Sequence, residues 1–211
     1  MAKNEYPARL SIDYPAKLSR VKTFFRFILA LPILAVFAIL TGTFDGAYYD
    51  EQTGQLMSSS GGIIVALFLV TVLLILFRQR YPRWWFDFNL ELNRFSTRVT
   101  AYLLFLTDKY PSTEEQQSVH LELDYPNVKQ DLNRGMPLVK WILAFPHYVV
   151  LLLLAVPVLG AIIIAWFAVL FTGRYPKGLF DFVVGYTRWN LRVSAYAIFL
   201  ITDKYPAFSL K

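Results

Sequence analysis

Two stripes of ionisable side chains share one pattern, an aspartate followed by two arginines at spacings that place all three on one face of a helix. They are Asp87, Arg94 and Arg98 in the first stripe, and Asp181, Arg188 and Arg192 in the second. The planar guanidinium fork of arginine suits phosphate, so each stripe is a candidate site for a lipid headgroup. Charged stripes on helices more often brace the fold or face solvent, and this second interpretation stays open.

A lone histidine, His147, lies within an apolar segment and is a candidate polar site inside a membrane. Such a residue could relay protons, contact a quinone or bind haem. Its counterpart in the repeat described below is Ile33, so the chain holds no symmetric histidine pair. We therefore expect His147 to form a hydrogen bond with a neighbouring helix.

The remaining composition excludes several kinds of site. The chain has no cysteine and one further histidine, His120, which excludes thiolate and multi-histidine metal centres within one chain. The sequence shows no Ser-His-Asp arrangement and no phosphate-binding glycine loop. We predict no catalytic residue, no metal and no cofactor, and an enzyme is the less favoured class. A bound phospholipid is expected.

Composition and charge favour a membrane protein. Hydrophobic residues make up 56% of the 211 residues, above the roughly 45–50% of soluble domains. The formal charge of +6 would suit nucleic acid, but the basic residues crowd the ends of apolar runs. A bilayer with anionic headgroups is therefore the expected partner, and nucleic acid is not.

The helices expected to carry the two stripes and His147 lie in a sequence that repeats itself. Four motifs occur twice in the same order: Asp13–Pro15 and Asp124–Pro126, Arg80–Phe88 and Arg174–Phe182, Arg98–Tyr102 and Arg192–Tyr196, Thr107–Pro111 and Thr202–Pro206. The chain therefore divides into two tandem copies, residues 1–112 and 113–211.

Each copy contains two apolar runs that are candidates for transmembrane helices, which need about 20 residues. In the first copy they are residues 22–41 and 61–77. In the second they are residues 137–156 and 158–172, separated by a tight turn at Pro157. Basic residues flank each pair of runs, whereas the loop between the first two carries only acidic charges. Both termini are therefore expected in the cytoplasm.

After each predicted hairpin the sequence indicates one amphipathic helix, residues 84–106 and 178–201. We expect each helix to lie along the cytoplasmic boundary of the membrane with its aromatic face toward lipid. Residues 9–13 and 120–124 alternate apolar and polar side chains and should pair as a small antiparallel ribbon. The predicted fold class is an all-α integral membrane protein of two parallel repeats, each a transmembrane hairpin with an interfacial helix, plus this ribbon.

The linked motifs resemble a known family of bacterial membrane proteins, the domain of unknown function 4389 family, in two tandem copies. The second copy carries most of the resemblance, in Ala144–His147, Phe171–Pro176, Gly178–Gly185 and Arg192–Tyr196. The resemblance implies a multi-pass protein of the bacterial inner membrane and implies no activity.

Three functions remain open. The leading hypothesis is a non-enzymatic protein, either an accessory or scaffold subunit of a larger membrane complex or a lipid-organising protein. The alternatives are an oligomeric channel or carrier and an enzyme that handles lipid or quinone at the cytoplasmic boundary. Besides the bilayer, the expected partners are other membrane protein subunits or further copies of this chain.

Overall fold

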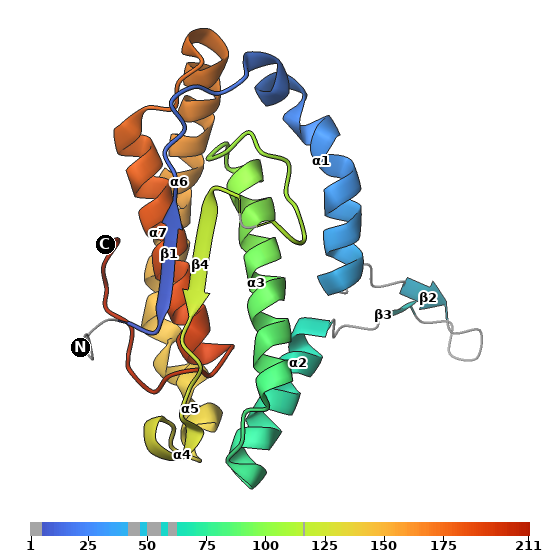
Figure 1. Cartoon of the computed structure of the whole chain (residues 1–211), viewed down its shortest axis with the longest axis vertical. Helices are drawn as coiled ribbons and strands as arrows, with labels where there is room; N and C mark the ends of the chain where they lie inside the picture. The colour runs from blue at the N-terminus through green and yellow to red at the C-terminus, as the bar shows by residue number, and fades with distance from the viewer. Residues whose placement is uncertain (1–5, 42–46, 50–55, 59–62, 116) are drawn as a thin grey trace.

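The structure is a computed structural model, and it describes residues 6–41, 47–49, 56–58, 63–115 and 117–211 (Figure 1). Its elements are β1 (Ala8–Ile12), α1 (Arg20–Thr41), β2 (Ala47–Tyr49), β3 (Leu56–Ser58), α2 (Ile63–Leu73), a π-helix (Leu74–Arg78), α3 (Arg83–Leu103), β4 (Val119–Leu123), α4 (Val128–Asp131), α5 (Met136–Leu143), α6 (Phe145–Thr172) and α7 (Lys177–Ala197). The helices α1, α3, α6 and α7 run roughly along the longest axis of the molecule. The described chain is therefore mainly helical.

The predicted ribbon is confirmed. β1 pairs antiparallel with β4, with Leu10 opposite Leu121 and Arg9 opposite Glu122. Because side chains alternate across a strand, Leu10 and Leu121 enter the core while Arg9 and Glu122 lie on the outer side. A second two-stranded sheet joins β2 to β3.

The two copies interlock through the ribbon. β1 of the first copy packs on α7 of the second, and β4 of the second packs on α3 of the first (Figure 1). An arginine joins each contact: Arg188 Nε donates to the Leu10 carbonyl at 3.0 Å, and Arg94 Nε donates to the Leu121 carbonyl at 3.1 Å. Each half therefore completes its packing with a strand from the other half.

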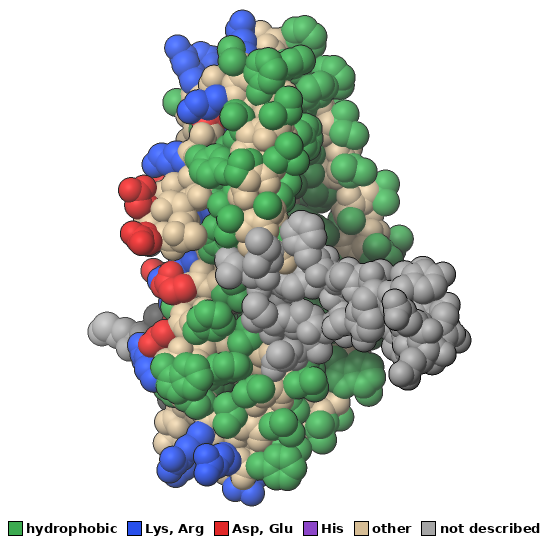
Figure 2. Space-filling model, turned by 90° about the vertical axis from the view of Figure 1, so that its right-hand side faces the viewer, with side chains coloured by type: hydrophobic (Ala, Val, Ile, Leu, Met, Phe, Trp, Pro, Cys, Tyr) green, Lys and Arg blue, Asp and Glu red, His purple; other side chains and the backbone are tan. Residues whose placement is uncertain are grey.

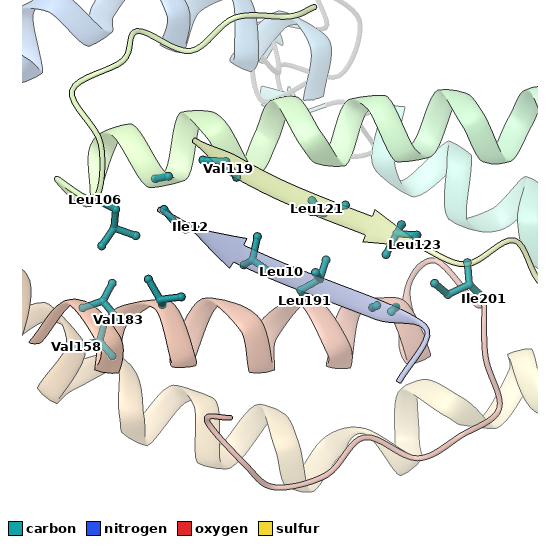
Figure 3. Packing of buried hydrophobic residues seen from close by; sticks show 14 of the residues in the cluster. Leu10, Ile12, Leu106, Val119, Leu121, Leu123, Val158, Val183, Leu191 and Ile201 are labelled. Carbon is teal, nitrogen blue, oxygen red and sulfur yellow. The ribbon is translucent and has the colours of Figure 1, made fainter. Parts of the chain in front are cut away.

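The ribbon, α6 and α7 share the largest hydrophobic cluster of the described residues. Figure 3 shows Leu10 and Leu121 of the ribbon near Leu191 of α7, and Val183 of α7 beside Val158 of α6. Another cluster joins α1 to α3 and consists of Ala30, Ile33, Phe95, Val99 and Tyr102. Burial of these side chains is what holds the long helices against one another.

The two predicted amphipathic helices are present as α3 and α7, but part of the face that we expected toward lipid is buried within the protein. Val99 and Tyr102 of α3 are buried against α1. Their counterparts Val193 and Tyr196 of α7 are buried with residues of α6. The reason is that α1 and α6 lie alongside these helices and cover these residues, whereas Phe88 near the start of α3 is 48% exposed.

The second predicted hairpin is also wrong. α6 continues from Phe145 to Thr172 without a turn at Pro157, and the residues before it form the short α5. A proline removes one main-chain hydrogen bond from a helix. Ala161 and Ala165, beyond the proline, pack into the core, and this packing holds both parts of α6 in one continuous helix.

Two stretches are long and apolar enough to cross a membrane, judged by length and composition alone. They are Arg20–Ala38, within α1, and Met136–Thr172, which combines α5 and α6. The apolar stretch Leu67–Arg78 is shorter. The four spans expected from the sequence thus become two candidates among the described residues, and the start of the second predicted run, residues 61–62, lies outside the described part.

Candidate functional site

Exposed apolar side chains gather on the side of the molecule formed by α1, α5 and α6. Figure 2, which faces α1 and α2, shows hydrophobic side chains above and below the undescribed residues and charged side chains along the left edge and at the two ends. We call the apolar surface the apolar face, and it includes Phe24, Phe27 and Leu31 of α1, Trp141 of α5, and Leu152, Val156 and Phe171 of α6. Large apolar side chains exposed together in this way mark a contact with a membrane or a protein.

The sequence of α6 explains how the apolar face arises. The helix is apolar all round, so packing decides which of its sides is buried. The buried side recurs at spacings of three, four and seven residues and comprises His147, Leu151, Val158, Ala161, Ala165 and Val169. On the opposite side Leu152, Val156 and Phe171 are exposed by 72%, 73% and 75%. The exposed side extends over the full length of the helix.

The ribbon carries charge on the other side of the molecule. Arg9 forms ion pairs with Asp124 at 2.7 Å and with Glu122 at 3.2 Å, and His120 lies 3.2 Å from Asp13. We call these five residues the ribbon face. All of them are at least one-third exposed, so their pairing adds little stability and the surface suits contact with water.

Each copy also buries one cation against one carboxylate, which the sequence pattern did not predict. Arg26 of α1 pairs with Asp108, and Lys140 of α5 pairs with Asp203 at 2.7 Å. Both cations are fully buried, and each also donates to a main-chain carbonyl. The carboxylates further accept a main-chain N–H just before the helix of their partner. The sequence repeat could have indicated these pairs, because the cation and the aspartate each occupy equivalent positions in the two copies.

The four arginines of the predicted stripes all donate to main-chain carbonyls. Arg94 and Arg188 hold the ribbon, as described above. Arg98 donates at 2.9 Å to a carbonyl in the loop after α3, and Arg192 donates to a carbonyl in the C-terminal segment. Burial lowers the pKa of Arg98 and of Arg192, yet guanidinium groups stay charged at neutral pH. These contacts brace the fold.

The two aspartates of the stripes lie apart from those arginines. Asp87 pairs at 3.3 Å with the arginine one turn before it, and its side chain is 51% exposed. The side chain of Asp181 is exposed and makes no hydrogen bond or ion pair with another described residue. The structure therefore does not bring either stripe together as a joint acidic and basic site.

His147 is fully buried, and its hydrogen bond to a neighbouring helix is confirmed. Trp189 Nε1 of α7 donates to His147 Nδ1 at 3.2 Å, and the ring of Phe208 stacks on the imidazole with centroids 3.9 Å apart. Within the described part of the chain no second ionisable side chain bonds to this ring, and no group of three or more His, Asp or Glu is placed to hold a metal ion. The surroundings suit a structural hydrogen bond better than proton transfer.

Comparison with known proteins identifies a family. The model of a family described as domain of unknown function (DUF4389) matches residues 55–113 and 136–209. One matched region falls in each half of the chain, which is consistent with two tandem copies. No curated protein and no solved structure matches the chain.

Proposed function

Since the chain belongs to the DUF4389 family, whose description assigns no activity, we propose a function from the surfaces of the molecule. The protein is a non-enzymatic, lipid-organising protein that lies in one leaflet of a membrane. α1, α5 and α6 lie in the plane of the leaflet with the apolar face among the acyl chains. The ribbon face points to water.

The observation that carries this proposal is the apolar side of α6, which is exposed from Phe145 to Phe171, while the charges of the ribbon face lie on the ribbon. With 28 residues, α6 is about 42 Å long, whereas the hydrocarbon core is roughly 30 Å thick. α7 packs along α6, and the ribbon packs on α7 at a level between the two ends of α6 (Figure 1). An upright α6 would hold the ribbon charges at hydrocarbon depth, where each costs about 3 kcal/mol. A flat α6 avoids this cost.

The distribution of basic side chains supports binding of the protein to the cytoplasmic leaflet. Lys and Arg side chains gather at both ends of the long axis, next to hydrophobic ones (Figure 2). The cytoplasmic leaflet is rich in anionic lipids that attract such residues. We therefore place the protein on the cytoplasmic side of a bacterial inner membrane with both termini in the cytoplasm. This placement replaces the multi-pass insertion that the apolar runs predict.

Other proteins would meet the ribbon face, because it points away from the leaflet. An accessory or scaffold role in a membrane complex is compatible with the same placement. An oligomeric channel is the second candidate, and one observation favours it. The ribbon faces of several upright copies, with Arg9, Glu122 and Asp124 exposed, would together line a charged aqueous path.

Cysteine labelling distinguishes the two placements, and the chain offers a cysteine-free background. Gln130→Cys and Lys177→Cys introduce exposed thiols before α5 and after α6. In sealed membrane vesicles a membrane-impermeant thiol reagent should label both positions from the same side. Labelling of the two positions from opposite sides would mean that α6 crosses the bilayer and would contradict the proposal. Ser11→Cys, on the outer side of β1, is the matched control and should follow Gln130→Cys.

Lipid organisation needs its own readout. Wild-type protein bound to vesicles should change acyl-chain order, reported by an order-sensitive membrane dye, because the apolar face occupies volume in one leaflet only. Leu152→Glu places a charge in the apolar face and should release part of the protein from the vesicles. The change in acyl-chain order should fall in proportion to the fraction released. Bound wild-type protein that leaves acyl-chain order unaltered would contradict the lipid-organising role.

A further inference from the structure

A cavity with a strongly basic lining lies at one end of the long axis. It has a volume of about 680 Å³ and is formed by the π-helix, the start of α3 and the segment between β4 and α4. We call it the first basic cavity, after the four cations that line it: Arg78, Arg80, Arg83 and Lys129. No acidic residue lines it. Its lining therefore favours an anion.

Three of these four cations form no ion pair within the part of the chain that the structure describes. Arg83 pairs with Asp87 at 3.3 Å and lies over the ring of Tyr125. Arg78, Arg80 and Lys129 are exposed and form no ion pair with any described residue. Cations that repel one another in a shared cavity gain most from a ligand that supplies negative charge.

The backbone at this cavity is unusual. A five-residue π-helix, Leu74–Arg78, leads into it, and Gln79 follows with a left-handed φ of 45°. Such a conformation costs free energy in a residue other than glycine, and π-helical turns are frequent at functional sites. Here the two features set Arg78 and Arg80 on the wall of one cavity, and Arg134 fixes the turn by donating to Gln79 Oε1 at 2.9 Å.

A second cavity is equivalent to the first, with the roles of the two copies exchanged. Its volume is about 440 Å³, and Lys17, Arg20 and Arg174 line it together with Thr172 and Gly173. We call it the second basic cavity. Gly173 follows α6 with a left-handed φ of 71°, as Gln79 follows the π-helix. Each cavity combines the end of an apolar helix from one copy with the segment after the Asp-Tyr-Pro motif of the other copy.

Both cavities adjoin exposed apolar side chains. Phe77 directly precedes Arg78 and is 73% exposed, and its counterpart Phe171 directly precedes Thr172 and is 75% exposed. Leu74 lines the first basic cavity itself. A ligand that suits both surfaces has an anionic head and an apolar tail.

We propose that the two basic cavities bind the headgroups of anionic phospholipids, one in each cavity, with the acyl chains running onto the apolar face. This inference deepens the proposed function, because it identifies the lipid class that the protein would organise. The ligand chemistry is a phosphodiester with a net negative charge, such as phosphatidylglycerol. The stripes predicted from the sequence are not the headgroup sites, since their arginines already donate to main-chain carbonyls.

Native mass spectrometry of the full chain in mild detergent, titrated with phosphatidylglycerol, tests the proposal. The wild type should retain two lipids. Arg78→Gln with Arg80→Gln should retain one and weaken the affinity of the first basic cavity about 25-fold, since a cation near a lipid surface contributes about fivefold. Arg20→Gln with Arg174→Gln should remove the other lipid. The number of bound lipids is counted without a bilayer. A failure of the lipid-binding proposal can therefore be distinguished from a failure of the proposed flat placement.

Three controls make the result decisive. Lys109→Gln with Lys211→Gln removes the same charge from exposed positions outside both cavities and should leave both lipids bound. Arg78→Lys with Arg80→Lys keeps the charge and should keep the lipid, which separates loss of binding from loss of folding. Inorganic phosphate should not displace the lipid. Equal retention of zwitterionic phosphatidylcholine, equal loss in the Lys109 and Lys211 control, or a wild type without retained phosphatidylglycerol would overturn the proposal.

Discussion

Asp108 and Asp203 each have two functions in the fold. Each carboxylate pairs with a buried cation, Arg26 or Lys140, and accepts a main-chain N–H before the helix that carries the cation. Removing one partner of a buried pair leaves an uncompensated charge, which usually costs more than the pair contributes. Stability at these positions therefore depends on keeping both partners.

We predict that Asp108→Ala lowers the free energy of unfolding by about 3–5 kcal/mol, because the fully buried Arg26 loses its counter-charge. Denaturant titration in detergent micelles measures the change. Asp181→Ala is the matched control and should have no measurable effect, since the side chain of Asp181 is exposed and makes no bond with a described residue. Equal stability of the two variants would show that the pair is unimportant.

These pairs could not be predicted from the local pattern. A cation at the end of an apolar run looks the same whether it faces headgroups or a buried carboxylate. The difference lies in a contact between α1 and the loop after α3, 82 positions apart in the chain. His147 was easier to predict, because a buried imidazole needs a hydrogen-bond partner wherever the fold places it.

At the scale of elements, the continuity of α6 predicts how substitution of two glycines changes the free energy of unfolding. Gly160 lies inside α6 with no atom within 4 Å of where a Cβ would be, whereas Gly173 has a left-handed φ of 71°. Gly160→Ala should raise the free energy of unfolding by up to about 1 kcal/mol, because alanine favours a helix. Gly173→Ala should lower it by about 1 kcal/mol through backbone strain.

Thermal unfolding of the two variants in the same detergent checks this prediction. A hairpin turn at Pro157–Gly160 would reverse the first sign, because turn glycines often need conformations that alanine avoids. Destabilisation by Gly160→Ala would therefore argue for the hairpin and against a continuous α6.

The elements themselves followed well from periodicity. Alternation predicted the ribbon, and three- and four-residue spacing predicted α3 and α7. The prediction of a turn in α6 was wrong, because a proline and a glycine in an apolar run are compatible with either a turn or a continuous helix. Only the packing of residues such as Ala161 and Ala165 against the core decides between the two.

At the scale of the whole molecule, the sequence predicted a membrane protein of two copies but not how the copies interlock. β1 packs on α7 and β4 on α3, so each strand leaves its own copy. This exchange puts the charged ribbon on α7, at a level between the two ends of α6, which no local pattern reveals. The proposed flat placement rests on that arrangement.

Partition onto vesicles should depend on the apolar face. Leu152→Glu should weaken binding to phosphatidylcholine–phosphatidylglycerol vesicles about 30-fold, because a buried charge costs about 2 kcal/mol even near the interface. Flotation on a density gradient measures the bound fraction. Ser11→Glu, on the outer side of β1, adds the same charge and should change binding little. Equal effects of the two variants would contradict the assignment of the apolar face.

The depth of α6 in the bilayer is the most direct test of the proposal that α6 lies flat in one leaflet. Spin labels at Phe145, Leu152, Val156, Ile163 and Phe171, each introduced singly through cysteine, sample exposed positions along the helix. Collision with oxygen and with a water-soluble nickel complex reports the depth of each label. A flat helix predicts one shallow depth for all five. Depths that are greatest near the middle of the helix and change by about 1.5 Å per residue would mean that α6 stands upright, and would contradict the flat placement.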